Sequence, residues 1–258
     1  MYCHTPVLHS VEGTLANVRH LGSNDHVQHY VADLLQHGST QHVHIKTAYD
    51  PRAQNEIIKE SRVWHDLGQR FPDHILTPLD TRLSYPDGTN LPCIVTPQLP
   101  RDLKDCYESR TYTPNDIAAL LTHACEGIMK INDHGIVVRD IKPGNILVTD
   151  ALEARLIDFG PSVQVGAKDV PHTSTDRYEP PEHERARLKK RNLVASPAED
   201  VYSMAAVAKH LLCRDLTPDL QTMLRICMLE NPQQRPAMQF LYETLNAYTA
   251  IQTKRIAA

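Results

Sequence analysis

The stretch His134–Val148 reads HGIVVRDIKPGNILV and places charged and amide side chains inside an otherwise apolar run. An arginine, an aspartate, a lysine and an asparagine stand close together there, at Arg139, Asp140, Lys142 and Asn145. A second polar turn follows at LIDFG, where Asp158 lies between an apolar segment and a Phe-Gly pair. A charged surface loop would explain either stretch alone. The combination indicates a site that uses carboxylates, an ammonium group and an amide together.

Length and composition are those of an ordinary soluble protein. The chain has 258 residues, enough for one large domain or a two-lobed unit, and 41% of them are hydrophobic. A formal net charge of -4 gives no reason to expect nucleic acid as a partner. No signal-like leader opens the chain and no apolar run approaches the ~20 residues that span a bilayer, so we expect no membrane partner and a cytoplasmic location. A secreted effector without a cleavable signal would look the same.

Cysteine and histidine usage indicates neither a disulfide framework nor a zinc framework. The six cysteines are scattered without a C-x-x-C pair, as in proteins with reduced, packed thiols. Fifteen histidines are many for this length, and His42 and His44 share one face of a predicted strand. They are either a metal site or surface and interstrand imidazoles. The lack of a carboxylate or cysteine at ligand spacing favours the second interpretation.

Hydrophobic periodicity divides the chain into a strand-rich first part and a helix-rich second part. HYVADLL, HVHIKTAY, ILTPLDTRLSY and LPCIVTPQL are typical of strands, and QNEIIKESRVWHDLG, residues 54–68, is typical of a helix. From Thr113 onward the pattern is helical, and the first long helix has a threonine cap followed by proline and ends at Gly135. We predict an α+β fold with two lobes, residues 1–98 and 99–258, joined near residues 96–102.

RDIKPGN followed by LIDFG resembles the catalytic loop and the D-F-G metal-binding motif of eukaryotic-type protein kinases. The lysine in the first motif is the pattern of serine/threonine rather than tyrosine kinases. The resemblance implies a two-lobed protein kinase fold, with a small antiparallel-sheet N-lobe that holds one main helix and a mostly helical C-lobe. It also implies ATP and Mg²⁺ as cofactors and a protein with a serine or threonine acceptor as substrate.

In this family the protein positions the reactants and neutralises charge that develops on the phosphate oxygens. By resemblance, Asp140 accepts the proton of the substrate hydroxyl, and Lys142 supplies positive charge to the γ-phosphate. Asn145 and Asp158 offer oxygen ligands of the kind that Mg²⁺ prefers.

The resemblance extends to nucleotide-binding residues. VHIK places Lys46 where the family's strand lysine contacts the α- and β-phosphates, and its ion-pair partner is Glu60 or Glu56 of the following helix. Glu60 is preferred because Val63, Trp64 and Leu67 then follow it with core-facing spacing. The other candidates are Gly22 in the phosphate-covering loop, Thr96, Pro97 and Leu99 in the hinge, Asp102 near the ribose hydroxyls, and Leu147.

STDRYEPPE resembles the end of the activation segment, with Thr175 near the catalytic aspartate and Glu182 as the closing glutamate. In the family this glutamate pairs with a distant arginine, and NPQQRP supplies Arg235. Asp200 resembles the helix aspartate that braces the catalytic loop. Arg139 is placed to pair with a phosphate on the activation segment. The candidate acceptors are Ser162, Thr173 and Ser174, each of which is otherwise an ordinary loop residue.

The phosphate-covering loop departs from the family pattern. LGSNDHVQHYV keeps Gly22 but has Asn24 and Val27 where the second and third glycines belong, and their side chains hold the backbone away from a nucleotide. An ungapped alignment puts His29 at the apolar position above the base. A slip of one or two residues puts Val27 or Val31 there instead.

Three further departures follow. His44 replaces the small alanine over the adenine ring, where an imidazole either stacks on the base or fills the pocket. Val138 replaces the histidine of H-R-D, which changes packing without removing a proton carrier. Only CRDL separates two predicted helices, so there is no room for an extra helix that the family often uses for docking. The basic run Arg185–Arg191 is either a solvated helix face or a docking patch for an acidic partner.

We predict an active serine/threonine protein kinase that uses Mg-ATP and autophosphorylates. One alternative is a pseudokinase that acts as a binding or regulatory module, motivated by the glycine-poor loop and His44. Another is a kinase-fold nucleotidyl transferase that uses the same metal site. A pure scaffold has no chemical need for the six retained residues, Lys46, Glu60, Asp140, Lys142, Asn145 and Asp158.

Overall fold

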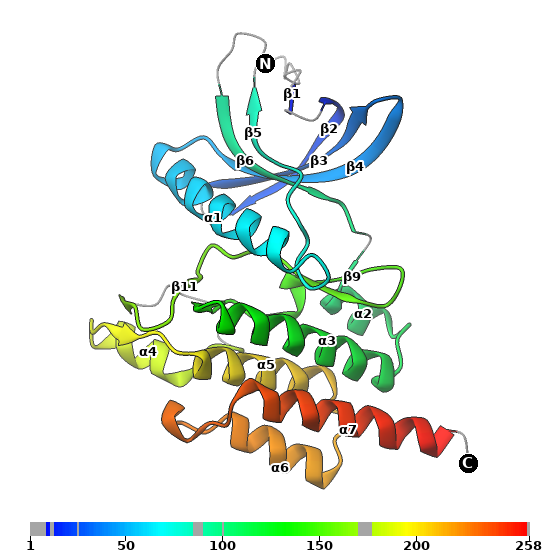
Figure 1. Cartoon of the computed structure of the whole chain (residues 1–258), viewed down its shortest axis with the longest axis vertical. Helices are drawn as coiled ribbons and strands as arrows, with labels where there is room; N and C mark the ends of the chain where they lie inside the picture. Colours follow the sequence, from blue (N-terminus) through cyan, green and yellow to red (C-terminus); the bar gives the residue numbers. More distant parts are fainter. Residues whose placement is uncertain are drawn as a thin grey trace. The chain divides into compact units, whose positions relative to one another are not determined.

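The computed structural model describes residues 9–10, 13–24, 26–84, 90–99, 101–169 and 177–256. Contacts divide the chain into two compact units, one made of Met1–Pro72 with Leu76–Gln98 and the other of Asp73–Ile75 with Leu99–Ala258. Figure 1 shows an antiparallel sheet with one helix in the first unit and a mostly helical second unit. The architecture is therefore the predicted α+β one.

An antiparallel sheet forms the body of the first unit. Its strand order is β1-β2-β3-β4-β6-β5, and the short β1 pairs with both β2 and β5, which closes the sheet into a barrel. The strands are β1 (His9–Ser10), β2 (Gly13–Asn24), β3 (Val27–Gln36), β4 (Ser39–Ala48), β5 (Asp80–Ser84) and β6 (Asn90–Pro97).

Alternation along β4 separates the hydrophobic core from a polar face. Val43 and Ile45 are buried, whereas His44 and Lys46 between and after them are only partly buried. Because successive side chains of a strand point to opposite faces, the two sets lie on opposite sides of the sheet. The core side also holds Leu15, Ala32, Leu34, Leu83, Leu91, Cys93 and Val95.

Helix α1 (Pro51–Arg70) begins three residues before the predicted start at Gln54. The signal for the earlier start is local: Asp50 Oδ1 accepts hydrogen bonds from the backbone N–H groups of residues 52 and 53, and proline takes the first helical position. One face of α1 is buried, and Trp64 Nε1 donates to the carbonyl of Leu76 at 2.7 Å. This contact fixes α1 within the first unit.

The second unit contains six further α-helices, two 3-10 turns and three small strand groups among the described residues. The strand groups are β10-β9-β7, β11-β8 and β12-β13. In chain order the elements are β7 (Arg101–Asp102), α2 (Leu103–Ser109), α3 (Pro114–Asp133), β8 (Ile136–Val137), η1 (Pro143–Asn145), β9 (Ile146–Val148), β10 (Ala154–Leu156), β11 (Val163–Gln164), β12 (Lys168–Asp169), α4 (Pro181–Leu188), β13 (Leu193–Val194), α5 (Pro197–Leu211), α6 (Pro218–Cys227), η2 (Pro232–Gln234) and α7 (Met238–Ile256).

Helix α3 is the centre of this unit, and its ends lie where the sequence predicts them. Thr113 caps the helix in a reciprocal capping box with Asp116, and Gly135 follows its end with a positive φ of 83°. Figure 1 shows α3, α5 and α7 in successive layers, and α3 contacts both of the others. The resulting core carries the catalytic-loop sequence on β8, η1 and the residues between them.

Two sequence-level expectations concern the whole chain. Cys93, Cys106, Cys125 and Cys227 are buried free thiols and Cys213 is an exposed one, as predicted for reduced, packed cysteines. Within the described part of the chain, no helix combines the length and apolarity needed to cross a bilayer.

Candidate catalytic site

The loop between β8 and β9 gathers the polar residues of RDIKPGN around one carboxylate. Lys142 Nζ donates to Asp140 Oδ2 at 2.6 Å. Asn145 Nδ2 donates both to the same Oδ2, at 3.0 Å, and to the backbone carbonyl of Asp140, at 2.9 Å. The 3-10 turn η1, with proline at its first position, brings Asn145 back toward Asp140. The sequence therefore folds locally so that an ammonium group and an amide hold one aspartate side chain.

Asp158 is joined to this loop through the backbone. The N–H of Ile157 donates to the carbonyl of Asn145 at 3.1 Å, so that Asp158 follows directly on the catalytic loop. Asp158 has a φ of +65°, in the left-handed region that non-glycine residues seldom adopt. The next side chain, Phe159, is 1% exposed and anchors the turn. Strained backbone of this kind persists where the surrounding structure fixes it, and it is concentrated at functional sites.

Asp200, at the start of α5, holds the catalytic loop from its buried side. Its carboxylate accepts the backbone N–H groups of Val138 and Arg139, each at 2.9 Å, and Asn132 Nδ2 at 2.8 Å. Complete burial raises the pKa of Asp200 to about 6, although the three hydrogen bonds favour the carboxylate and act in the opposite direction. Val138 contributes a backbone donor and a buried side chain here.

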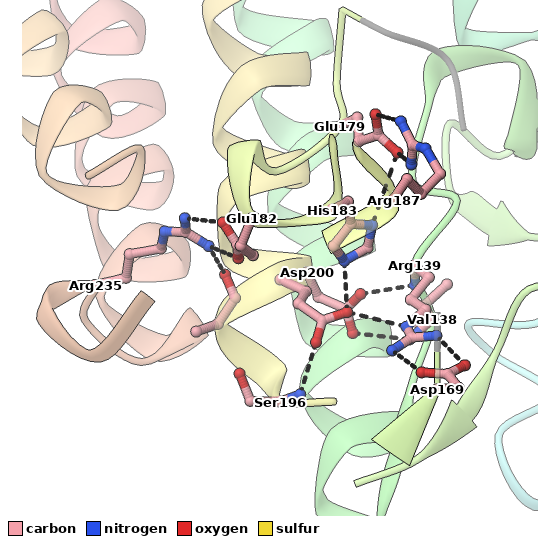
Figure 2. Close-up of polar contacts among 12 residues, drawn as sticks. Val138, Arg139, Asp169, Glu179, Glu182, His183, Arg187, Ser196, Asp200 and Arg235 are labelled. Atoms are coloured by element: carbon pink, nitrogen blue, oxygen red, sulfur yellow. Dashed lines mark hydrogen bonds and ion pairs between the residues drawn. The ribbon is translucent and has the colours of Figure 1, made fainter. Parts of the chain in front are cut away.

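Glu182 and Arg235 form a buried ion pair that joins α4 to the segment before α7 (Figure 2). Both guanidinium Nη atoms donate to the carboxylate at 2.6 Å, and the Arg235 side chain is 0% exposed. Arg235 also donates to three backbone carbonyls, from Nε to Leu229, from Nη1 to Ala198 and from Nη2 to Glu230. Its guanidinium also lies 4.9 Å from the ring centroid of Tyr202.

In the first unit, Lys46 Nζ donates to Glu60 Oε1 at 2.8 Å, and both side chains are largely buried. Glu56 pairs instead with Lys59 on the exposed side of α1. The choice between the two glutamates is thereby settled in favour of Glu60, which faces the sheet because it lies on the buried stripe of α1.

Comparison with known proteins agrees with these motifs. The family described as "Protein kinase domain" matches residues 30–218. The chain belongs to the protein kinase family.

Curated relatives of this kinase-family chain include bacterial serine/threonine kinases. It is 28% identical over 176 residues to the "Probable serine/threonine-protein kinase PknB" of Corynebacterium glutamicum, which covers 65% of this chain and 26% of that protein. It is 31% identical over 176 residues to "Serine/threonine-protein kinases drp72" of Corynebacterium efficiens, covering 64% of this chain and 32% of that protein. It is 31% identical over 131 residues to "Serine/threonine-protein kinase PknA" of Mycobacterium tuberculosis, covering 39% of this chain and 29% of that protein. The chain thus spans about a third or less of the length of these relatives.

The two strands that flank the glycine-poor loop of this kinase domain pair closely. Strands β2 and β3 remain paired as far as Asn24 and Val27, and His26, just before β3, takes a positive φ of 71°. Gly22 lies within β2 opposite His29. Gly22, Asn24 and Val27, which were considered for the phosphate-covering loop, therefore lie in paired strands.

Strand register places His29, Val31 and Val27 along β4. Val31 stands directly opposite His44, His29 opposite Lys46 and Val27 opposite Ala48, and the choice of residue above the base stays a prediction. His29 Nδ1 and His44 Nε2 are 3.2 Å apart, and their rings stack with centroids 5.3 Å apart. Burial, followed by the neighbouring His29 and Lys46 charges, lowers the pKa of His44 to about 4. His44 therefore forms part of an interstrand imidazole pair, while His42 pairs with Asp33.

The predicted hinge and ribose residues occupy two strand pairs. Thr96 is buried on β6 opposite His44, and Pro97 stands opposite Val43 at the end of the same strand. Leu99 is the first residue of the second unit after β6. In the second unit, Asp102 and Leu147 are direct cross-strand partners on β7 and β9. Asp102 also caps α2 by accepting the N–H of residue 105, and burial raises its pKa.

Arg139 pairs with carboxylates of its own chain in the structure, and its pairing with a phosphate on the activation segment stays a prediction. Arg139 already donates from Nη1 and Nη2 to the two oxygens of Asp169, at 2.7 and 2.9 Å, and from Nε to Glu199 at 3.0 Å. Burial alone would lower the pKa of Arg139, but these hydrogen bonds and charges outweigh it and raise that pKa. Ser162 Oγ donates to the Phe159 carbonyl at 2.6 Å. Thr173, Ser174 and Thr175 lie outside the described residues.

The second unit contains the basic run Arg185–Arg191 and the short connection between α5 and α6. Arg185 pairs with Glu230, and Arg187 forms a two-point ion pair with Glu179, while Lys189, Lys190 and Arg191 are exposed. The run is therefore partly a set of internal ion pairs rather than a uniformly solvated face. Only residues 212–217 connect α5 to α6, which leaves no additional helix between them, as predicted.

Three residues near the catalytic loop were not predicted from the sequence. Asp169 and Glu199 bind Arg139, and buried His183 Nε2 lies 2.8 Å from Glu199 Oε2. Glu199 carried a usable signal because it stands three residues after Ser196 at a helix start, the spacing of a capping box. No sequence pattern singles out Asp169 or His183.

Proposed function

We propose that this chain is the catalytic domain of a serine/threonine protein kinase, which transfers the γ-phosphate of ATP to a hydroxyl of a protein substrate and of its own chain. The observation that carries the proposal is the Asp140 carboxylate held by Lys142 and Asn145 within hydrogen-bond distance. Membership of the protein kinase family supports it. The lobe boundary belongs to the same proposal, with residues 1–98 as the N-lobe and 99–258 as the C-lobe.

The charges around Asp140 suit phosphoryl transfer. A carboxylate whose position is fixed can orient a substrate hydroxyl and accept its proton. Lys142 is 30% exposed at its side chain, so its ammonium group is accessible to a phosphate as well as to Asp140. In the first unit, Lys46 held by Glu60 presents a second positive charge for the α- and β-phosphates. Positioning and charge neutralisation are the main contributions that a protein makes to this reaction.

The donor set fits Mg²⁺. Asn145 uses its amide nitrogen for Asp140, which leaves the amide oxygen as the ligand atom, and Asp158 supplies a carboxylate. Both are hard oxygen ligands, and Mg²⁺ is commonly held by one or two such protein groups together with phosphate oxygens. Bound Mg²⁺ would neutralise charge on the phosphates of ATP. We therefore assign Asn145 and Asp158 as its ligands.

A protein substrate is proposed because the chain carries the PPE-closed activation segment and the buried Glu182–Arg235 pair that follows it. The lysine at position 142 and the named bacterial relatives both support serine or threonine as the acceptor. Exposed Lys189, Lys190 and Arg191 provide a surface on which a regulatory protein partner could bind.

A pseudokinase is the second candidate, and the observation that favours it is the pair of stacked imidazoles. His29 and His44 occupy the same face of the sheet as Lys46, where the family binds its nucleotide. If the pair excludes ATP, the domain is a binding module. A nucleotidyl transferase that uses the same metal ligands is the third candidate.

One labelling experiment separates the three. Purified protein is incubated with Mg²⁺ and either γ- or α-labelled ATP, beside Asp140→Asn and Asp158→Ala variants. The kinase proposal predicts γ-label on the wild type and none on either variant. Absence of label, together with no ATP-dependent rise in melting temperature, would favour the binding module. Transfer of α-label would identify a nucleotidyl transferase.

A further inference from the structure

The guanidinium of Arg139 is surrounded by carboxylates that the sequence itself supplies. Asp169 accepts two hydrogen bonds from its Nη atoms and Glu199 accepts one from Nε. The Arg139 side chain is 3% exposed, so these contacts are made largely out of water. Figure 2 shows Asp169 facing Arg139 beside Val138 and Asp200. One buried cation therefore already has two anionic partners.

Asp169 lies in the segment where a phosphate acceptor was sought from the sequence. It is on β12, between the Asp158 turn and the PPE motif, and the strand pairs with β13 so that Asp169 is opposite Leu193. Its side chain is 32% exposed, and the backbone pairing holds it independently of the ion pair. The carboxylate thus meets Arg139 in a two-point geometry of the kind that arginine forms with carboxylates and phosphates alike.

Glu199 is fixed by the start of its own helix, α5, and by the preceding helix, α4. Its Oε1 accepts the backbone N–H of Ser196 at 2.9 Å, and its Oε2 lies 2.8 Å from His183 Nε2. His183 Nδ1 lies 3.9 Å from Glu179, which is bound by Arg187. A chain of polar contacts therefore runs from α4 to Arg139, and every member of it is an unmodified side chain of this protein.

We propose that Asp169, with Glu199, is the permanent counter-ion of Arg139, and that the catalytic loop of this kinase is held in place without a phosphate on the activation segment. The inference rests on the proposed function and deepens it. Arg139 precedes Asp140 directly, and its own backbone N–H is bound by Asp200, so the side-chain and backbone contacts of Arg139 act on the same loop. A phosphate at Arg139 would meet two carboxylates already in contact with it, and like charges at such distances repel. Asp169 and Glu199 are positioning residues, because they act through Arg139.

The first test compares phosphorylation states. Protein treated with a phosphatase, and shown by intact mass to carry no phosphate, is assayed for initial transfer of γ-phosphate to casein. The triple variant S162A/T173A/S174A, which lacks the three candidate acceptors, is assayed beside it. Both are expected to stay within about twofold of untreated wild type. A tenfold loss that recovers after preincubation of the phosphatase-treated protein with ATP would overturn the proposal.

The second test removes the counter-ion. Asp169→Asn should lower kcat about tenfold or more, the scale of effects caused by small misplacement of reacting groups, whereas Asp169→Glu, which keeps the charge, should restore most of the rate. Glu153→Gln is the matched control, since it removes the charge from a surface contact to Arg155 of similar length, 2.9 Å. Unchanged kcat in Asp169→Asn would overturn the proposal.

A third measurement does not depend on activity. Amide hydrogen exchange of residues 138–145, 168–169 and 193–194 is followed in wild type, Asp169→Asn and Glu153→Gln. Faster exchange in Asp169→Asn alone is expected, because the loop and the β12–β13 pair then lose their shared contact. If no form of the protein transfers phosphate, the proposed function fails, but this readout still decides whether Asp169 holds the loop. Equal exchange in all three proteins would overturn the positioning role.

Discussion

Replacing Arg235 with methionine should strongly destabilise the second unit. The change removes the guanidinium but keeps much of the apolar stem, so Glu182 loses its partner and three backbone carbonyls lose the hydrogen bonds that Arg235 donates. Arg235 is 0% exposed at its side chain and Glu182 is 10% exposed, so the stranded carboxylate stays poorly solvated. Breaking a buried pair on one side costs about 3 to 5 kcal/mol. Since whole domains are stable by only ~5 to 15 kcal/mol, the variant should lose a large part of its stability.

The assay is urea unfolding followed by far-UV circular dichroism, because most helices belong to the second unit. Trp64, the single tryptophan, lies in the first unit, so its fluorescence reports that unit separately. Arg185→Met is the matched control: it breaks the exposed pair with Glu230 and should cost less than about 1 kcal/mol. The double variant E182L/R235M should be more stable than R235M, because no charge is stranded. A loss below about 1 kcal/mol in R235M, or a double variant less stable than R235M, would refute the reasoning.

Three further predictions concern the site. Lys46→Met should abolish most γ-phosphate transfer and weaken the ATP-dependent melting shift. Glu60→Gln should weaken both less, because an amide oxygen can still accept from Lys46. Equal activity of wild type and the two variants would contradict the nucleotide assignment. His44 has a pKa of about 4 in the folded protein instead of 6.5. The unfolded chain therefore takes up the proton first, and the free energy of unfolding should fall by about 3 kcal/mol as the pH drops from 6.5 toward 4. In His44→Leu, the urea midpoint of unfolding followed by Trp64 fluorescence should fall less between pH 7 and 4.5 than it does in wild type. The same fall of the midpoint in both proteins would count against a buried neutral imidazole. Asp200 has a raised pKa of about 6, so it should protonate as the pH falls through 6 and lose an acceptor for the catalytic loop. We expect kcat to fall there, although protonation relieves the free-energy cost of burying the charge. A kcat independent of pH between 7 and 5 would contradict this role.

Local signals in the sequence predicted much of the fold. Thr113, Pro114 and Gly135 mark the ends of α3 through capping and backbone preferences that act within a few residues. The RDIKPGN and LIDFG motifs likewise place Asp140 and Asp158, because the residues that set their geometry lie in the same short loops. Glu60 could be chosen over Glu56 from helix periodicity alone.

Contacts set by distant parts of the chain could not be predicted this way. Asp169 and Glu199 reach Arg139 across separations of 30 and 60 residues, and no local pattern records which carboxylate faces which guanidinium. The β3–β4 register could not be predicted either, because a slip of two residues leaves the alternation of inward and outward side chains unchanged. The identity of the residue opposite His44 therefore required the observed strand pairing.

The most direct test of the account is the rate of γ-phosphate transfer by wild type and Asp140→Asn at saturating Mg-ATP. If Asp140 accepts the proton of the substrate hydroxyl, the variant should lose about 10²- to 10⁴-fold in kcat. Its ATP-dependent melting shift should match that of wild type, because Asp140 is assigned to the hydroxyl and not to the nucleotide. Equal rates in the two proteins, or no transfer by a wild type that binds ATP, would contradict the central claim.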